Sequence, residues 1–492
     1  MQDKTPPSSP PAAVAPGQGS HDTDVPPALK EFLLSGWRPF SPDLPPPMPH
    51  ADSFAARRQR LSARFPGEVL VVPAGHEKVR ANDTYFRFRP GSDFYYLTGS
   101  QEPDSVLVLE PLPQGGHRSV LYAEPVTRDD ISFFSDRNKG ELWVGRRMGL
   151  DHSRAYFAVD EARSLKQFDL YLRGLVAGAP TGGGSGRPLR LLRGISEKVD
   201  AARPSLKEDT DFAAFCSELR LEKDARELEE MQVVIDATAR GFEDVIRGMR
   251  DRIRTEREVE VAFYARARTE GNDVGYGTIA AGGAHACVLH WTRNDAPLDP
   301  TALLLLDAGV EGKALYTADI TRTLPVSGKF SKEQREIYEL VWESQQAAIA
   351  AIRPGVDFME PNKVAMKVLA EGLERLGILP MPAAEALLQE KQLYRRYSLH
   401  NISHMLGIDV HDCAKARREV YKYGPLKVGM VLTVEPGLYF QLDDLTVPER
   451  YRGIGVRIED DVVVTEEGCT NLSAGIPSQA DAVEQWMARL WA

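Results

Sequence analysis

Residues 303–323 read LLLLDAGVEGKALYTADITRT, and this stretch decides the fold of the second half of the chain. An apolar strand (302–311) contains Asp307 near its end, a turn follows near Gly312, and the next strand (316–325) contains Asp319. If the two strands pair as a hairpin, their even separation of twelve residues is compatible with both carboxylates on one face. A carboxylate that follows four leucines is costly to bury without a compensating cation, so the stretch predicts a charged site inside a sheet.

Three further residues in the last third of the chain are candidate metal ligands. His404 lies in LHNISHMLGIDVHD, Glu435 in VLTVEPGLY and Glu459 in GVRIEDDVVV. Together with the two aspartates they provide four carboxylates and one imidazole. Such a set can neutralise and hold a pair of divalent cations, which is a common device for activating water.

Other polar residues near these motifs are candidates for catalysis. His400 and His411 flank His404, so three of the ten histidines fall within twelve residues, with ligation and proton or oxyanion handling as the available roles. His290, beside Trp291 in CVLHWTRND, is as readily structural as functional. Arg457 is expected to hold one of the carboxylate ligands in its charged form and to limit repulsion among them.

Composition excludes several classes of protein. The net charge of −11 argues against nucleic acid as the main partner, because phosphate binding needs a basic face. No run approaches the roughly 20 apolar residues that a membrane span requires, and no secretory signal is visible. The four cysteines are scattered without CxxC spacing, which is typical of a reducing compartment. We therefore expect a cytoplasmic protein.

The 492 residues are too many for one ordinary core, so two domains are expected. The N-terminal strands are predicted from apolar runs that include FYYLTG (94–99), and TGGGSGRP (181–188) is predicted to be a surface loop. Capping boxes begin helices after Asp224 and after Ser331. The predicted organisation is a disordered Pro-rich tail (1–27), a short helix (28–36), a mixed α/β non-catalytic domain (51–205), an α+β domain with an antiparallel sheet and a third helix at 362–377 (211–475), and a helical extension (476–492).

These motifs resemble those of the pita-bread metallopeptidases, and within that family the aminopeptidase P (Xaa-Pro aminopeptidase) branch. The resemblance lies in DITRT, VLTVEPGLY and YRGIGVRIEDD, and in FRFRPGSDFYYLTG and ELWVGRRMG of the N-terminal half, so it covers about 51–475. It implies an α+β protein with a C-terminal pita-bread catalytic domain and a smaller mixed α/β N-terminal domain. The implied reaction is release of an N-terminal residue that precedes proline.

The resemblance also implies a role for each candidate residue. Asp319 and Glu459 would bridge two metal ions, Asp307 would complete one site, and His404 with Glu435 would complete the other. Mn²⁺ suits this oxygen-rich set, although Zn²⁺, Co²⁺ and Fe²⁺ also bind such ligands. A bridging water would attack the peptide carbonyl, with Glu435 as the proton carrier. The remaining implied roles are stabilisation of substrate and tetrahedral intermediate by His290 and His411, contact with the proline ring by His400, and support of the ligands by Arg457.

The chain departs from the family pattern at two positions of the cavity motif. Asn401 stands where the family usually has glycine, and Met405 where it often has tryptophan; the loop between the two aspartates is also one residue longer. These differences concern substrate preference rather than the ligands. A prolidase (Xaa-Pro dipeptidase) of the same fold therefore stays an alternative. A non-catalytic peptide-binding module is disfavoured because all five ligands are retained. Relatives form dimers or tetramers, so a homo-oligomer is expected, with peptides carrying proline at position two as substrates.

Overall fold

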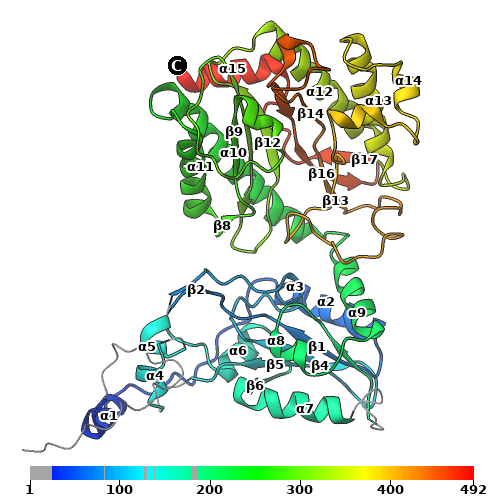
Figure 1. Cartoon of the computed structure of the whole chain (residues 1–492). Helices are drawn as coiled ribbons and strands as arrows, with labels where there is room; N and C mark the ends of the chain where they lie inside the picture. The colour runs from blue at the N-terminus through cyan, green and yellow to red at the C-terminus, as the bar shows by residue number, and fades with distance from the viewer. Residues whose placement is uncertain (1–24, 83, 127–129, 138, 179–185) are drawn as a thin grey trace, which may run out of the picture. The chain divides into compact units, whose positions relative to one another are not determined.

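The computed structural model describes residues 25–82, 84–126, 130–137, 139–178 and 186–492. Nearly all of the predicted tail (1–27) and most of the predicted loop (181–188) lie outside these residues. The chain divides into two units, Met1–Phe212 and Ala213–Ala492. Each unit combines helices and strands, as predicted (Figure 1). The predicted domain boundaries stay a prediction.

The first unit is built on a five-stranded sheet with the order β6-β5-β4-β1-β7. The central pairs β5–β4 and β4–β1 are antiparallel, and the two outer pairs are parallel. The strand β1 is buried along its whole length, which explains its continuous apolar sequence VLVVP. The helices and strands of the first unit are α1 (Pro27–Leu34), α2 (Ala51–Arg64), β1 (Val69–Pro73), β2 (Val79–Ala81), β3 (Thr84–Tyr85), α3 (Ser92–Thr98), β4 (Val106–Pro111), β5 (His117–Ala123), α4 (Ser132–Ser135), α5 (Glu141–Val144), α6 (Leu150–Tyr156), β6 (Glu161–Ser164), α7 (Phe168–Gly178), β7 (Leu189–Leu191), α8 (Glu197–Ala201) and α9 (Lys207–Leu219). The last of these, α9, crosses the boundary between the two units.

The prediction of a strand at FYYLTG was wrong, because these residues belong to the helix α3. Every residue of α3 from Asp93 to Thr98 is buried, so the helix has no polar face to reveal a helical period. Gly99 ends the helix with a φ of 71°, in the left-handed region that favours glycine.

The helices predicted for the second unit are present. Both α10 and α12 begin with a capping box, in which the side chains of Asp224 and Ser331 accept hydrogen bonds from the backbone of Glu227 and Gln334. The third predicted helix is α13, and α15 occupies most of the predicted extension. The helices of this unit are α10 (Ala225–Asp251), α11 (Glu256–Glu270), α12 (Lys332–Ala351), α13 (Glu360–Arg375), α14 (Ala383–Ala386) and α15 (Ala480–Trp491), with short 3-10 turns at η3 (Gly283–Cys287), η4 (Leu393–Arg396) and η5 (Glu449–Tyr451).

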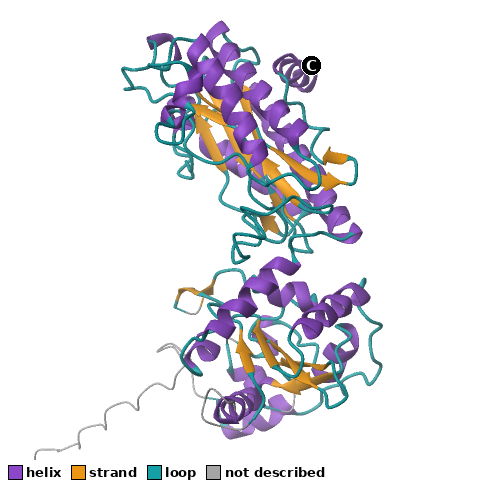
Figure 2. Ribbon diagram, turned by 90° about the vertical axis from the view of Figure 1, so that its right-hand side faces the viewer, coloured by secondary structure: helices purple, strands orange, loops and turns teal. Residues whose placement is uncertain are grey.

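All strand pairs of the second unit are antiparallel, as predicted. Two three-stranded sheets have the orders β12-β10-β9 and β13-β16-β17, and a backbone bridge between Thr321 and Glu459 connects them. Helices flank these strands (Figure 2), and in the view of Figure 1 α10 and α11 lie to the left of them and α12 and α13 to the right. The strands are β8 (Asp273–Val274), β9 (Ile279–Gly282), β10 (Leu303–Ala308), β11 (Val310–Glu311), β12 (Ile320–Pro325), β13 (Val431–Val434), β14 (Gly437–Tyr439), β15 (Gly455–Arg457), β16 (Asp460–Thr465) and β17 (Gly468–Asn471).

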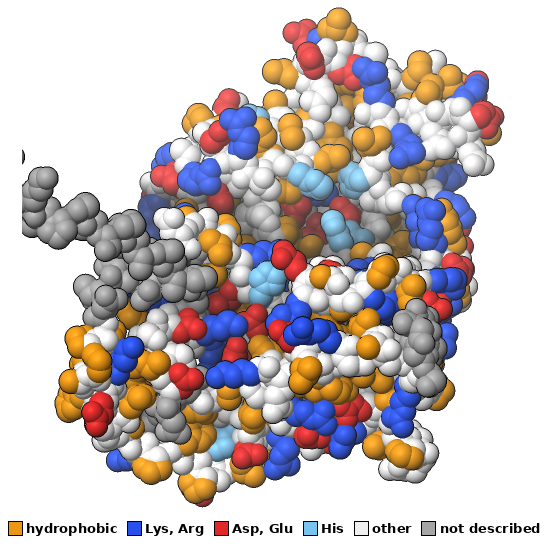
Figure 3. All heavy atoms as spheres, turned by 60° about the horizontal axis from the view of Figure 1, so that its bottom comes forward, with side chains coloured by type: hydrophobic (Ala, Val, Ile, Leu, Met, Phe, Trp, Pro, Cys, Tyr) orange, Lys and Arg blue, Asp and Glu red, His pale blue; other side chains and the backbone are white. Residues whose placement is uncertain are grey.

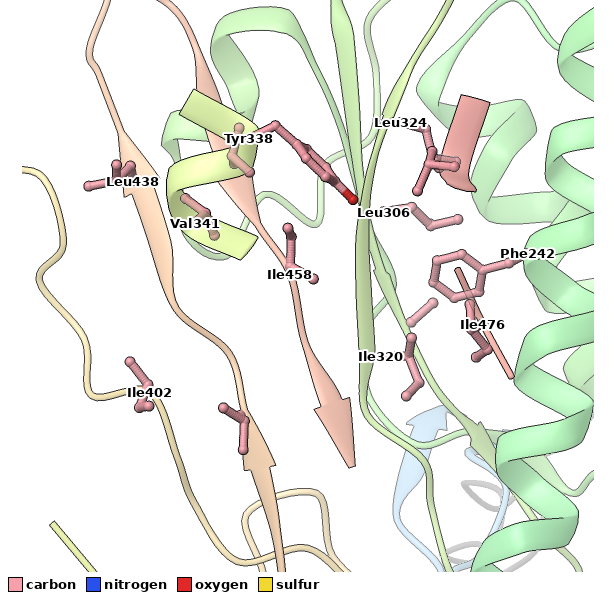
Figure 4. Packing of buried hydrophobic residues seen from close by; sticks show 14 of the residues in the cluster. Phe242, Leu306, Ile320, Leu324, Tyr338, Val341, Ile402, Leu438, Ile458 and Ile476 are labelled. Carbon is pink, nitrogen blue, oxygen red and sulfur yellow. The ribbon is translucent and has the colours of Figure 1, made fainter. Parts of the chain in front are cut away.

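The core of this unit runs through both sheets and places the site between them. Phe242 of α10, Leu306 of β10 and Tyr338 of α12 are fully buried in one continuous apolar cluster (Figure 4). Burying such large side chains contributes roughly 1.5–3 kcal/mol each to folding. Within the described part of the chain, no helix combines the length and apolar composition needed to cross a bilayer.

The register of β10 and β12 explains how two aspartates meet. Asp307 pairs with Thr321, and Asp319 lies two residues before that position. Because side chains alternate between faces, Asp307 and Asp319 project from the same face of the hairpin. Asp319 precedes β12 rather than lying within it, which is a small correction to the predicted strand.

Candidate metal centre and active site

One cavity of about 600 Å³ in the second unit is lined by every candidate metal ligand and catalytic residue of the sequence analysis. Figure 3 shows a hollow in which histidine side chains gather over acidic ones. Asn401 also lines the cavity, whereas Met405 is fully buried and does not. The predicted residues in the lining are Asp307, Asp319, His404, Glu435, Glu459, His290, His400, His411 and Arg457. Their individual roles stay predictions.

Asp307 is held by two donors on opposite oxygens of its carboxylate. The Tyr276 hydroxyl donates to Oδ1 at 2.6 Å, and Nη2 of Arg457 donates to Oδ2 at 2.5 Å. Arg457 comes from β15, so this ion pair ties β10 to the strand before Glu459. Burial raises the pKa of Asp307, and Arg457 opposes that rise. The ion pair brings Arg457 against a candidate ligand, and its role of holding that ligand in the charged form stays a prediction.

Asp319, His404 and Glu459 form the centre of the cluster. Each offers one ligand atom, and the three atoms lie within 4.8 Å of one another. Nε2 of His404 is 3.3 Å from Oδ2 of Asp319. Nδ1 of the same ring faces the Met405 carbonyl at 3.3 Å, and a carbonyl can only accept, so the proton belongs on Nδ1. Nε2 is then the nitrogen available to a metal.

Glu435 follows β13 and lies between two histidines. Its Oε1 is 3.4 Å from Nε2 of His404, and its Oε2 is 3.7 Å from Nδ1 of His400. The backbone N–H of Glu435 donates to the Ile402 carbonyl at 2.8 Å, which fixes the residue beside the segment that carries both histidines. Burial raises the pKa of Glu435 to about 7, so its carboxyl group can exchange a proton near neutral pH.

The charges of the cluster are unbalanced without cations. Burial, and then repulsion from Asp319, raises the pKa of Glu459 well above its ordinary value. Burial alone would lower the pKa of His404, but Asp319 and Glu435 raise it to about 9. Arg457 and His404 thus face four carboxylates that disfavour one another's ionisation. Divalent cations would remove this cost, so the donor set fits a pair of hard or borderline metal ions.

The other two histidines of the motif differ in environment from His404. Burial, and then the charge of Arg457, lowers the pKa of His400 to about 4, and its Nε2 lies 2.7 Å from the Tyr439 hydroxyl. The His411 ring packs edge-on against His404, with 4.4 Å between centroids, and burial lowers its pKa as well. Both are therefore neutral at physiological pH. Nδ1 of His400 faces the Asn401 carbonyl at 2.9 Å, so the single ring proton belongs there and Nε2 accepts from Tyr439. Of these two histidines, His411 is the one able to donate a hydrogen bond to a substrate oxygen.

Four residues that support the ligands were missed by the sequence analysis. Tyr276 holds Asp307, and Thr321 donates from Oγ1 to Glu459 at 2.5 Å. Asp461 accepts the backbone N–H of Asp319, and its other oxygen has no hydrogen-bond partner among the described residues. Tyr439 connects Arg457 with His400. Thr321 could have been found, because it lies two residues after Asp319 and so shares its face; the others have no sequence signal.

We expect Thr321→Val to weaken metal binding about 10- to 100-fold, because it removes the donor to Glu459 and leaves Nε of Arg457 without its 3.2 Å acceptor. Titration calorimetry with Mn²⁺ would measure the change. Thr323→Val is the matched control: it is equally buried on the same strand, but its hydroxyl bonds only the Arg457 backbone. Equal affinities for the two variants would contradict the role given to Thr321.

Comparison with known proteins follows the same division of the chain. Residues 229–466 match Metallopeptidase family M24, which is the class of protein that this fold and carboxylate–histidine cluster define. Residues 54–181 match the Aminopeptidase P, N-terminal domain. Xaa-Pro aminopeptidase 1 of Streptomyces coelicolor is 49% identical over 467 residues, which cover 94% of this chain and 92% of that protein. Xaa-Pro aminopeptidase of Escherichia coli is 35% identical over 88% of this chain and 97% of its own length.

Solved structures of aminopeptidases also match this chain. Aminopeptidase P from E. coli with the inhibitor Pro-Leu has a TM-score of 0.78 at 31% identity, covering 90% of this chain and 99% of that one. A Pseudomonas aeruginosa aminopeptidase gives the same TM-score at 32% identity. The chain belongs to the aminopeptidase P family of pita-bread metallopeptidases.

Proposed function

We propose that this protein is a Xaa-Pro aminopeptidase that depends on two divalent metal ions and releases the N-terminal residue of peptides with proline at position two. The observation that carries the proposal is the convergence of five metal-ligating side chains and three further histidines on one cavity. Relatives named Xaa-Pro aminopeptidase match nearly the whole chain, so both units of the chain take part in the likeness.

Two metal ions would be held by separate parts of the ligand set. Asp319 and Glu459 would contact both ions, Asp307 would complete one site, and His404 with Glu435 would complete the other. Mn²⁺ is the ion that we propose, and Zn²⁺ also suits the donors; one E. coli relative is described as Zn substituted. When bound, the ions supply Lewis-acid activation of water and of the peptide carbonyl.

The chain's own residues move protons and orient the substrate. Glu435 is the proposed proton carrier, because its carboxylate lies in the cavity between His400 and His404, where it can take a proton from water and return it to the leaving nitrogen of proline. His290 and His411 line the same cavity and would steady the substrate carbonyl as negative charge develops on it. His400, neutral and fixed against Tyr439, would contact the proline ring.

The cavity volume is in the range of sites that bind small ligands. The two candidate activities, Xaa-Pro aminopeptidase and prolidase, differ in the length of the peptide that they cleave. We expect metal-dependent cleavage of a Xaa-Pro-Xaa tripeptide, measured beside a Xaa-Pro dipeptide with Mn²⁺ and with a chelator. Cleavage of the dipeptide alone would replace the proposal with a prolidase. Absence of cleavage of either peptide, with metal bound, would favour a non-catalytic peptide-binding module.

The remaining proposals concern the setting of the enzyme. A cytoplasmic location is supported by the four cysteines, all of which carry free thiols. We propose a homo-oligomer and no nucleic-acid partner, the latter because of the net charge of −11. The proposed domains are 51–205 and 211–475, and the matches at 54–181 and 229–466 fall within them.

A further inference from the structure

A buried carboxylate outside the metal cluster has no part in the mechanism above. Glu256 is the first residue of α11, and its side chain is fully buried. Burying a carboxylate costs several kcal/mol unless hydrogen bonds compensate it. Its position therefore needs an explanation from what it contacts.

Glu256 accepts four hydrogen bonds, two on each oxygen. The Gly282 backbone N–H and Nδ1 of His285 donate to Oε1, both at 2.8 Å. Nε1 of Trp291 donates to Oε2 at 2.9 Å, and the Ala296 backbone N–H donates to the same oxygen at 3.0 Å. All four donors lie between 282 and 296, so one side chain holds the segment that leaves β9 and returns toward β10.

The two side-chain donors also contact each other. The rings of His285 and Trp291 stack with 3.8 Å between centroids and 23° between planes. The segment 285–291 is thus closed at both ends, by the stack and by the shared carboxylate. Its middle is attached elsewhere: Sγ of Cys287 donates to the Phe440 carbonyl, and Gln441 donates to the Cys287 carbonyl. We call 285–291, closed in this way, the clamped segment.

His290 is the last residue but one of the clamped segment, directly before Trp291. It lines the cavity with the metal ligands, although its own side chain is largely exposed. Its ring makes no hydrogen bond within the part of the chain that the structure describes. Its position therefore depends on the backbone that carries it, and that backbone is fixed by Glu256.

We propose that Glu256 is a positioning residue for peptide hydrolysis, which acts by holding the clamped segment so that His290 faces the metal ligands. The inference rests on the proposed function. The position requires a carboxylate rather than any polar residue, because all four contacts are donors. A glutamine offers one accepting oxygen, and its amide N–H₂ group would face two N–H groups of the protein.

Glu256→Gln is expected to lower kcat about 100-fold with little change in KM, since the contact of His290 is used mainly in the transition state. The affinity for Mn²⁺ should not change, because no metal ligand lies in the clamped segment. The same substitution in a His290→Ala background should cause almost no further loss, because the residue through which Glu256 acts is already gone. The measurements are steady-state kinetics with a Xaa-Pro-Xaa tripeptide and Mn²⁺, made on both single variants and on the double variant.

Thr255→Ala is the matched control, because it removes the N-cap of the same helix and leaves the four contacts of Glu256 in place. It should lower thermal stability without the change in kcat.

If Glu256→Gln folds poorly, Trp291→Phe is the substitute test. This variant keeps the ring stack and loses one hydrogen-bond donor to Glu256. We expect a smaller fall in kcat, with the same dependence on His290. Equal losses from Glu256→Gln with and without His290 would overturn the proposal and reduce Glu256 to a structural role.

Hydrogen exchange separates this proposal from the proposed function. Amides of residues 282–296 should exchange faster in Glu256→Gln than in the unmodified protein, while those of β13 and β16 should not change. Unchanged exchange in 282–296 would refute the clamp whatever the activity. If the unmodified protein does not cleave the tripeptide at all, the proposed function fails, and the exchange result still decides whether Glu256 holds the segment.

Discussion

Replacing Glu435 with glutamine is expected to lower kcat by about 1,000-fold or more while the fold is retained. The amide keeps the size of the side chain but cannot take up a proton, so the step that general acid–base catalysis accelerates by roughly 100- to 10,000-fold is lost. The substitution also removes a negative charge from a buried cluster of like charges. The metal-free variant should therefore be at least as stable as the unmodified protein above pH 7.

The measurement is turnover of a Xaa-Pro-Xaa tripeptide at saturating Mn²⁺, with the bound metal determined on the same sample. This distinguishes loss of proton transfer from loss of an ion. Glu227→Gln is the control, because Glu227 is also buried but takes part in the capping box of α10 and bonds Tyr316. It should affect stability and not turnover. Near-normal turnover of Glu435→Gln, with metal bound, would refute the assigned role.

Removing the metal ions is expected to abolish activity and to make the free energy of unfolding fall as pH rises from about 5 to 9. Folding raises the pKa of Glu435 from 4.5 to about 7 and that of His404 from 6.5 to about 9. A raised pKa means that the folded protein binds the proton more tightly than the unfolded chain does. The stabilisation is present below pH 4.5 for Glu435 and below 6.5 for His404, and it is lost as pH rises through 7 and 9.

Metal ions reverse this dependence, because they favour ionised carboxylates and a neutral imidazole. Mn²⁺ at a fixed concentration, about 100 times its Kd at pH 8, should add about 3 kcal/mol to the free energy of unfolding at that pH. That gain should be larger at pH 8 than at pH 6. Thermal or urea unfolding with Mn²⁺ and with a chelator would measure it. The metal-free Glu435→Gln variant should show a flatter pH profile, and Glu227→Gln the profile of the unmodified protein. A gain independent of pH, or full activity after demetallation, would contradict the model of the site.

The carboxylate ligands were predictable because each lies within or directly beside a buried strand. Asp307 after four leucines and Glu459 between GVRI and DDVVV stand out against their neighbours, since a buried charge is rare without a partner. The capping boxes at Asp224 and Ser331 were equally local signals, and both helices begin where they predict. The antiparallel pairing followed from hairpins in place of βαβ units.

Contacts between distant residues could not be read in the same way. Nothing near Tyr276 indicates that its hydroxyl reaches Asp307, because that contact depends on how β9 and β10 pair. Glu256 is a similar case: its four donors are 26 to 40 residues away, and in the sequence it is one more acidic residue at a helix start. The helix α3 was misassigned for a different reason, since aromatic residues buried on all sides show no period.

The bridge between Thr321 and Glu459 has a consequence for how the protein matures. The five proposed ligands extend from Asp307 to Glu459, and the last of them joins the first sheet only when β15 and β16 are in place. A chain that has been synthesised only as far as residue 450 lacks Glu459 and Arg457, and it carries the remaining carboxylates without their main counter-charge. Metal uptake would then be among the final events of folding. Bound metal would therefore indicate that the newly made chain is complete and correctly folded.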